Sequence, residues 1–374
     1  MKASPEQLQF HQLACQLFLL SSLPTFLITR FIIVAPFGRH VPSSSFFSSN
    51  EKKLNKNNQT INSNRYRWWY GPKFNARLSW FLFECPNLIW SCYCYYWYGL
   101  DGSSLFFLNP TPMSLAQGSG QMQVAEKTRA ITVFQNNQLI VSANLLLLLL
   151  FTLHYINRAI IYPLRMNSNS QDVPLIVTLS AMMVTIVNGY LQCFYLCQIR
   201  PFQPLVLLDW NNTIVDENEA PIANCDENSW CWLGVILFVI GAGINFHSDG
   251  VLRNLRRYGP SMKPEPSNEK EAKNQSLTST HQHEQCATGK NHSSTYYIPH
   301  SPFFQYISCP NFFGELLEWF GFAMASNFSL PSLAFVIYTA SNLIPRGVAH
   351  HEWYLRKFED YPSERKWAVI PFVV

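Results

Sequence analysis

Five stretches of this chain run for about twenty residues or more without any Asp, Glu, Lys or Arg. They are Gln7–Thr29, Ala130–Asn157, Val173–Ile199, Asn228–Ser248 and Trp319–Pro345. A helix that spans a membrane needs about 20 mostly apolar residues, so each stretch is long enough to cross a bilayer. The mean hydropathy of −0.01 hides this pattern because the polar segments 51–67 and 256–292 offset the apolar runs. The pattern predicts a polytopic membrane protein.

We predict an all-α membrane protein, a bundle of seven transmembrane helices. The expected spans are 12–35, 79–98, 139–163, 174–197, 231–247, 309–326 and 328–345. The second of these is apolar but is interrupted by Glu84. The turn-forming residues Asn327–Pro331 separate the last two spans, and the alternative is one long helix from Glu318 onward.

The distribution of Lys and Arg predicts the orientation of the bundle, because cytosolic loops are enriched in both residues. Segments 39–78, 248–308 and 346–374 carry eight, seven and five of them, whereas 99–138 carries two and 198–230 carries one. Seven spans then place the N-terminus in the lumen and the C-terminus in the cytosol. We interpret the N-terminal apolar run as an uncleaved first span.

The composition also excludes some classes of protein. Charged residues make up 13% and aromatic residues 15%, a balance that excludes a largely disordered chain. A net charge of +4 lacks the strongly basic field of a nucleic-acid-binding protein, so we expect the lipid bilayer and no nucleic acid as partner. No particular oligomeric state is predicted.

Two polar segments, 41–69 and 258–294, are typical of flexible, solvated loops. The second contains His281, His283, Glu284 and Cys286, but their spacing matches no closed tetrahedral pattern, so we predict no metal site. Cys225 and Cys231 would form either a disulfide or two free thiols. Cys92 and Cys94 lie in an aromatic run and are interpreted as packing at the membrane interface.

Ionisable residues at membrane depth are functional candidates because their burial is costly. Helical spacing groups most of them into three stripes. These are His154, Arg158 and Tyr162; Asn245, Asp249, Arg253 and Arg256; and Asn311, Glu315 and Glu318, with Glu84 and His247 apart. Such stripes line a cavity or, alternatively, form structural ion pairs that hold the bundle together.

The predicted cytosolic end adds cations beside aromatic rings, including Arg346, His350, Trp353, Tyr354 and Arg356. This chemistry suits either a nucleotide or anionic lipid headgroups. The chain contains neither a GxGxxG unit nor a GxxxxGK[ST] loop, so a bound nucleotide would not use a Rossmann or P-loop cradle.

Several segments resemble the steroid 5α-reductases (3-oxo-5α-steroid 4-dehydrogenases), most of all the type 1 enzymes. The matching segments are His154–Pro163, Asn188–Gln192, Gly243–Asp249 with Leu252–Arg256, Asn311–Trp319 and His350–Pro362, and more loosely Ala76–Pro86 and Ala35–His40. The resemblance implies a multi-pass protein of the endoplasmic reticulum membrane. It also implies NADPH-dependent reduction of the C4–C5 double bond of a 3-oxo-Δ4-steroid.

The resemblance implies site residues as well. Glu84 and Tyr155 would hold the 3-oxo group, where negative charge develops as hydride adds to C5. Trp80, Phe83 and Arg158 would contact the substrate. The expected cofactor residues are Tyr162, Asn245, Asp249, Arg253, Arg256, Tyr296, Asn311, Glu315, Glu318, Arg346, His350 and Tyr354, with Arg39 a looser match. The proton that reaches C4 would come from Tyr155 or from water.

The chain departs from the family in three places. Phe83 replaces a Gln, and the basic-Ile-Pro-x-Gly-Gly loop becomes Tyr297–Pro302. Segment 92–135 matches nothing in the family and is either a lineage insertion or an error in the gene model. The expected parts are 1–40 (first span), 41–69 (loop), 70–91 (second span), 92–135 (insertion), 136–257 (core with cofactor helix), 258–294 (polar insertion) and 295–374 (C-terminal reductase region).

Two alternatives remain beside the steroid reductase. One is a related membrane reductase that acts on polyprenal or an enoyl-CoA lipid. The other is a non-catalytic lipid-binding relative, which would bind a steroid without oxidising NADPH.

Overall fold

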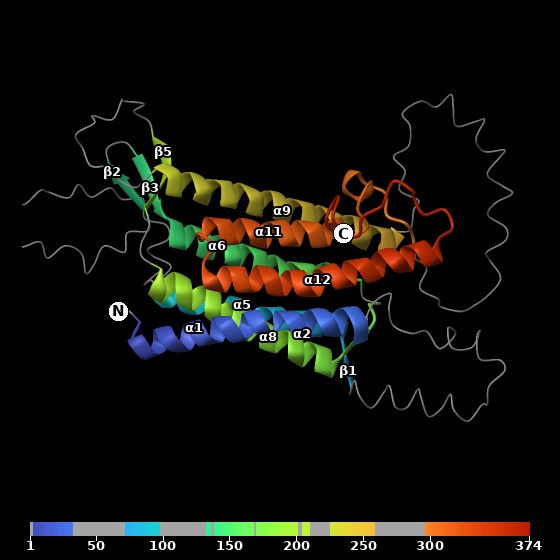
Figure 1. Ribbon diagram of the computed structural model, residues 1–374, viewed down its shortest axis with the longest axis horizontal. Helices are drawn as coiled ribbons and strands as arrows, with labels where there is room; N and C mark the ends of the chain where they lie inside the picture. The colour runs from blue at the N-terminus through green and yellow to red at the C-terminus, as the bar shows by residue number, and fades with distance from the viewer. Residues whose placement is uncertain are drawn as a thin grey trace, which may run out of the picture.

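The computed structural model describes residues 3–32, 72–97, 132–135, 138–167, 170–200, 204–209, 225–258 and 296–374. Long helices run side by side along the longest axis of this part of the chain (Figure 1). Arg39, loop 41–69, most of the predicted insertion and nearly all of segment 258–294 lie outside the described residues, as does the side chain of Cys225.

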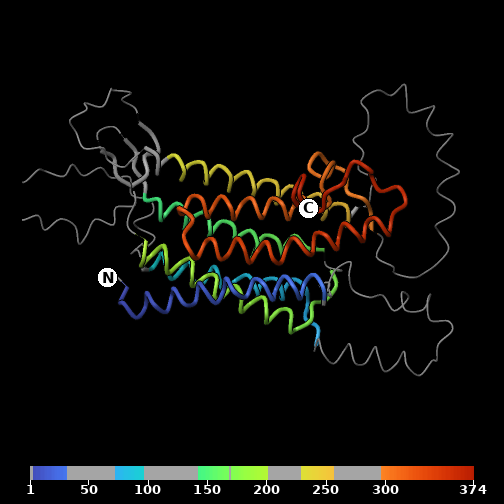
Figure 2. Tube along the Cα trace, in the orientation of Figure 1, coloured from blue at the N-terminus to red at the C-terminus, as the bar shows by residue number. Residues whose placement is uncertain are grey.

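The chain begins with α1 (Pro5–Leu20), α2 (Ser22–Leu27) and the π-helix η1 (Ile28–Ile32). A capping box starts α1, because the Ser4 hydroxyl accepts from the backbone of Gln7 while the Gln7 side chain accepts from the backbone of Ser4. The N-terminal helices pack against the C-terminal helix, which Figure 2 shows as neighbouring blue and red tubes.

The middle of the chain contains α5 (Ala76–Trp97), α6 (Ala143–Ile156), the π-helix η3 (Asn157–Ile161), α7 (Tyr162–Arg165), α8 (Leu175–Phe194) and the π-helix η4 (Tyr195–Ile199). A disulfide between Cys94 and Cys197 joins the end of α5 to η4. α5 covers nearly the whole of the predicted second span 79–98 and carries Glu84.

The last part contains α9 (Cys225–Tyr258), the 3₁₀-helix η6 (Pro302–Phe304), α11 (Pro310–Ala325) and α12 (Leu330–Lys357). The predicted break between the last two spans is present. Asn327 and Phe328 have φ values of 57° and 48°, and the Phe328 amide donates to the Ala323 carbonyl at 2.7 Å. This left-handed turn ends α11 and reverses the chain.

Among the described residues, five short strands accompany the helices. β1 (Lys73–Phe74) pairs with β4 (Val173–Pro174), and β2 (Thr132–Gln135), β3 (Gln138–Ser142) and β5 (Pro204–Asp209) form an antiparallel sheet in the order β2-β3-β5. The predicted span 139–163 therefore starts too early, since residues 139–142 pair with β5 and the helix begins at Ala143.

Within the part of the chain that the structure describes, four helical stretches are long and apolar enough to cross a membrane: Pro5–Phe31, Ala143–Arg165, Leu175–Ile199 and Ser229–Arg256. They coincide with four of the seven predicted spans. The other three predicted spans are the helices α5, α11 and α12, which fall short of that criterion in length or in apolar character. Seven spans and their orientation therefore stay predictions, while a helical membrane protein is established.

Glycines hold α9 and α11 in direct backbone contact. A Cβ on Gly314 would lie 2.5 Å from the backbone nitrogen of Asn245, and one on Gly241 would overlap the backbone of Glu318. Seven residues away on each helix, Gly234 and Gly321 meet in the same way. Small residues let membrane helices approach this closely. We call these four residues the glycine seam; it brings the polar stripes of the two helices together.

Candidate functional site

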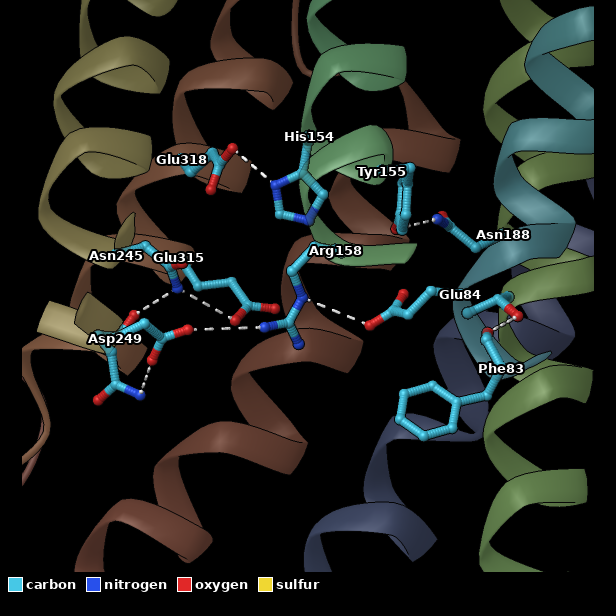
Figure 3. Close-up of polar contacts among 12 residues, drawn as sticks. Phe83, Glu84, His154, Tyr155, Arg158, Asn188, Asn245, Asp249, Glu315 and Glu318 are labelled. Carbon is cyan, nitrogen blue, oxygen red and sulfur yellow. Dashed lines mark hydrogen bonds and ion pairs between the residues drawn. The ribbon is translucent and has the colours of Figure 1, made fainter. Parts of the chain in front are cut away.

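Arg158 lies at the centre of the buried polar residues. Its Nε is 3.4 Å from Oε1 of Glu84, and its Nη1 is 4.0 Å from Oδ2 of Asp249. Figure 3 shows Glu84, Tyr155 and Asn188 on one side of Arg158, with Asn245, Asp249 and Glu315 on the other. Arg158 belongs to η3, and such wide turns are frequent at functional sites.

A chain of amides supports Tyr155. Nδ2 of Asn188 donates to the Tyr155 hydroxyl at 3.1 Å and to Oδ1 of Asn87 at 3.3 Å. Gln192, one turn further along α8, donates to Oδ1 of Asn188 at 3.2 Å and to the Pro331 carbonyl at 2.8 Å. Because the Tyr155 oxygen accepts from Asn188, its own proton can be donated to another group.

Among the described residues, Glu318 is bonded to His154 and not to the polar residues of α9. Oε1 of Glu318 accepts from Nδ1 of His154 at 2.7 Å, and both side chains are buried. The His154 ring also packs edge-on against Trp319, with centroids 4.6 Å apart. His154 therefore bonds to Glu318 of α11, whereas Arg158, on the same predicted helix face, pairs with Glu84 and Asp249.

The stripes of α9 and α11 form one continuous polar wall. Nδ2 of Asn245 donates to the Asn311 carbonyl at 2.9 Å and to Oε2 of Glu315 at 3.4 Å, while Nδ2 of Asn311 donates to Oδ1 of Asp249 at 3.1 Å. The stripe of Asn245 and Asp249 thus lies directly against the stripe of Asn311 and Glu315. His247 takes no part, since it is exposed and its ring lies against Phe303.

Aromatic rings surround the guanidinium of Arg158. It lies 4.9 Å from the Trp80 ring and 5.5 Å from the Tyr162 ring, and those rings are 4.7 Å apart. Arg253 approaches Tyr162 from the other side at 5.7 Å. Nε1 of Trp80 is buried and has no hydrogen-bond partner among the described residues. A buried donor of this kind fits a ligand that supplies an oxygen acceptor.

Phe83 lies beside this group. Its ring is 4.9 Å from the Trp80 ring, and its carbonyl accepts from Oγ1 of Thr185 on α8 at 2.5 Å. The hydroxyl of Thr185 therefore fixes the backbone next to Glu84, whereas the Phe83 side chain adds an apolar surface where the family has an amide.

The predicted cytosolic residues gather beyond the wall. Arg346 lies 5.5 Å from the Phe312 ring, which is 5.8 Å from the His350 ring. Tyr296 meets Trp353 at 5.1 Å. Tyr354 is buried and stacks on Tyr361 at 5.3 Å. Arg346 and His350 therefore lie near Phe312 of α11, whereas Tyr296 and Tyr354 contact rings of α12 and of the tail after it, and Arg256 is exposed.

The alternative of structural ion pairs is realised only in part. Arg158 forms ion pairs with Glu84 and Asp249. Among the described residues, neither Arg253 nor Arg256 forms an ion pair with a carboxylate. Two cations on the polar wall are therefore left for another partner. Sequence reasoning missed Asn87, Asn188 and Gln192; the four-residue spacing of the last two on α8 is the signal that would have found them.

The fold and the site define a helical membrane protein whose bundle holds a buried polar centre between an amide-supported tyrosine and a two-helix polar wall. The family model described as 3-oxo-5-alpha-steroid 4-dehydrogenase matches residues 171–264 and 276–374. The chain belongs to this family, and it is an oxidoreductase that acts on a CH–CH group.

Individual relatives agree with the family model. The chain is 30% identical over 307 residues to 3-oxo-5-alpha-steroid 4-dehydrogenase 1 of Rattus norvegicus, which covers 82% of this chain and 83% of the relative. It is 29% identical over 373 residues to steroid 5-alpha-reductase DET2 of Gossypium hirsutum, 98% of each chain. It is 34% identical over 230 residues to the Homo sapiens type 1 protein, 62% of this chain and 68% of the relative.

Proposed function

We propose that the protein reduces the C4–C5 double bond of a 3-oxo-Δ4-steroid with NADPH and releases a 5α-3-oxosteroid. The arrangement around Arg158 carries this proposal, because it separates two polar regions of different character (Figure 3). One region offers hydrogen-bond donors for a single oxygen. The other offers cations, amides and carboxylates for a nucleotide.

The first region is suited to a developing enolate. As a nucleophile adds at C5 of an enone, negative charge moves to the C3 oxygen, and donors aimed at that oxygen lower the barrier. Tyr155 retains a proton to donate because its oxygen accepts from Asn188. In the proposed complex Glu84 is a neutral carboxylic acid rather than the ionised partner of Arg158, and it is the second donor, while Arg158, Trp80 and Phe83 surround the substrate. C4 is then protonated by Tyr155 or by water.

The second region fits the cofactor by the chemistry of its donor set. Arg253, Arg256 and Arg346 supply charges for phosphate groups, and Arg rather than Lys suits their bidentate recognition. Asn245, Asp249, Asn311 and Glu315 supply neutral and anionic partners for hydroxyl and amide groups, with Tyr162, Tyr296, Glu318, His350 and Tyr354 around them. When bound, NADPH supplies the hydride that is added to C5.

We further propose the endoplasmic reticulum membrane as the location, with seven spans and the cofactor region in the cytosol. The disulfide between Cys94 and Cys197 supports this orientation, because disulfides persist in the lumen. Both cysteines lie at the end of the bundle opposite Arg253 and His350: Asn144, at the start of α6, donates to the carbonyls of Leu196 and Arg200 at that same end.

The experiment uses microsomes from cells that express the full chain, supplied with labelled testosterone or progesterone and NADPH. A 5α-reduced product from the wild type and little from Glu84→Ala is the expected result. Absence of product from an inserted, folded wild type would contradict the proposal. Parallel incubations with polyprenal and an enoyl-CoA test the related reductase, and steroid binding without oxidation of NADPH would identify a non-catalytic relative.

A further inference from the structure

A short turn in the tail after α12 exposes two large apolar side chains. Phe372 is 83% exposed and Val373 is 71% exposed, although Val369, a few residues earlier, is fully buried. The amides of Val373 and Val374 donate to the Ile370 carbonyl at 3.2 and 3.0 Å and close the turn. We call residues 370–374 the tail turn. Adjacent apolar side chains that a folded chain leaves open mark a surface for contact with lipid or with another molecule.

The backbone holds Phe372 in an unusual conformation. Its φ is 63°, in the left-handed region that bulky residues rarely adopt. The Val374 carbonyl accepts from the amides of Val369 and Ile370 at 2.8 and 2.9 Å, so hydrogen bonds across the turn maintain this conformation. The Phe372 ring lies 4.6 Å from the Trp367 ring. A strained residue that the surrounding fold keeps in place is a reason to look for a function there.

The tail that carries this turn lies beside the first turns of α11. The Cys309 amide donates to the Ala368 carbonyl at 2.9 Å, and Val369 belongs to a buried cluster against which Leu316 packs. A Cβ on Gly347 would overlap the Val369 side chain, so the tail also fits closely against α12. In Figure 1 the C mark accordingly lies beside α11 and not beyond the ends of the long helices. The chain therefore returns to the bundle after α12.

The start of α11 is level with an apolar stretch of α9. Nδ2 of Asn245 donates to the Asn311 carbonyl at 2.9 Å, which places the first turn of α11 beside Asn245. Asn245 lies inside the stretch Ser229–Arg256, which is long and apolar enough to cross a membrane. Exposed side chains at this level of the bundle meet the bilayer or its interface rather than bulk water.

The loop before α11 extends the same surface with residues that membrane interfaces favour. Phe303 and Tyr306 are exposed, and the Tyr306 carbonyl accepts from the Trp367 amide at 3.4 Å. The Phe303 ring lies 5.5 Å from the ring of His247 on α9, so this loop is continuous with the surface of a spanning helix. Lys366 is exposed next to Trp367. Tyrosine and tryptophan are enriched where a bilayer meets water, and a lysine there can reach the headgroups.

We propose that the tail turn inserts into the membrane interface, with Phe372 and Val373 at the boundary between the headgroups and the acyl chains. The partner is the bilayer that α9 crosses, and the contact anchors the tail outside the spanning helices. Transfer of these side chains from water to that boundary is favourable because it removes apolar surface from water. The depth of α11 in the membrane rests on the proposed function, whereas the exposure and shape of the tail turn do not.

The test places benzoylphenylalanine at one position at a time in the full chain, which is purified and reconstituted in vesicles of phosphatidylcholine and phosphatidylserine. On illumination this residue bonds covalently to a C–H group that touches it, and mass spectrometry identifies the partner. The tested positions are Phe372 and Val373. Ile240, exposed on α9, is the control that should label lipid, and Glu364, exposed in the same tail, is the control that should not.

We expect the yield of lipid adducts at Phe372 to lie within about threefold of that at Ile240 and to exceed that at Glu364 by about tenfold. The replacement keeps an aromatic ring at position 372 and should leave the fold intact. Val373 gives an independent reading if the chain altered at position 372 fails to fold.

Absence of lipid adducts at both tested positions, in vesicles where Ile240 labels lipid, would overturn the proposal. Adducts to a second copy of the chain in place of lipid would also overturn it and would assign the tail turn to a protein contact. The measurement uses neither steroid nor NADPH. Lipid adducts in a protein that forms no 5α-reduced steroid would therefore keep the anchor and remove the proposed function, whereas an active reductase without them would keep the function and remove the anchor.

Discussion

Arg158 Nε lies 3.4 Å from Glu84 Oε1, so a side chain of η3 forms an ion pair with one of α5 inside the bundle. The same guanidinium reaches Asp249 on α9 at 4.0 Å. One cation thus contacts both regions of the candidate site, and both of its carboxylate partners are buried. Substitutions with matched controls can separate the chemical role of these residues from their structural role.

Glu84→Ala should lower kcat/KM for a 3-oxo-Δ4-steroid by about 10²–10³, the usual loss when one donor to a developing oxyanion is removed. The control is Glu352→Ala, which removes a carboxylate whose pair with Arg30 is part-exposed. Surface pairs contribute little, so this variant should stay within about threefold of wild type. Equal losses in both variants would remove Glu84 from the mechanism.

Asn188→Leu should lower kcat more than it raises KM, because the Tyr155 hydroxyl loses the hydrogen bond that it accepts from Asn188. The buried side-chain amides of Gln192 and Asn87 also lose their hydrogen bonds to Asn188. Each unsatisfied buried group costs about 1–3 kcal/mol, so the melting temperature should fall as well. Ser180→Ala, on an exposed face of the same helix, is the control. A stable variant with wild-type kcat would show that Tyr155 needs no such support.

Gly241→Ala should destabilise the protein by about 1–3 kcal/mol or prevent its folding, because the added Cβ meets the backbone of α11. Gly243→Ala makes the same chemical change two residues away, where no atom lies within 4 Å. That control should be neutral or slightly stabilising, since Ala favours the helix. Thermal unfolding of the purified variants measures the difference, and similar melting temperatures would contradict the close contact.

Stability should fall as the pH drops below about 6.5, the ordinary pKa of histidine. Burial lowers the pKa of His351, which lies beyond the predicted last span. Its Nδ1 is 2.6 Å from Oγ of Ser308. Between about 6.5 and the lowered pKa, the unfolded chain binds more protons than the folded protein, so acid favours unfolding. His351→Gln should flatten this slope, whereas Lys357→Gln should not, as a pH series of melting temperatures would reveal.

The positions of the helices could largely be predicted from the sequence, because an uncharged apolar run that is long enough to cross a bilayer most often forms a spanning helix. The start of the third predicted span, 139–163, could not be predicted in this way. Residues 139–142 are apolar, and only their pairing with β5, which is distant in sequence, makes them a strand. The end of α5 at Trp97 agrees with the predicted span 79–98, which rests on the apolar run rather than on the family resemblance.

The candidate site was predictable where residues carry charge. Glu84, Arg158, Asp249 and Glu315 were found because ionisable groups are rare in apolar helices. Asn188 and Gln192 are neutral, so the same search passed over them although their amides position Tyr155. The tail turn was missed for another reason: it follows the last apolar run, and only the folded chain places it beside the start of α11.

The glycine seam has a mechanical consequence. Because α9 and α11 touch through their backbones at the glycine seam, neither helix can slide along the other there without its backbone meeting that of its neighbour. We expect the pair to behave as a single rigid body, with the polar wall unchanged in shape whether or not a ligand is present. Any widening that admits a bulky lipid must then come from α5 and α8, whose contact is made by longer side chains such as Trp90 and Tyr190.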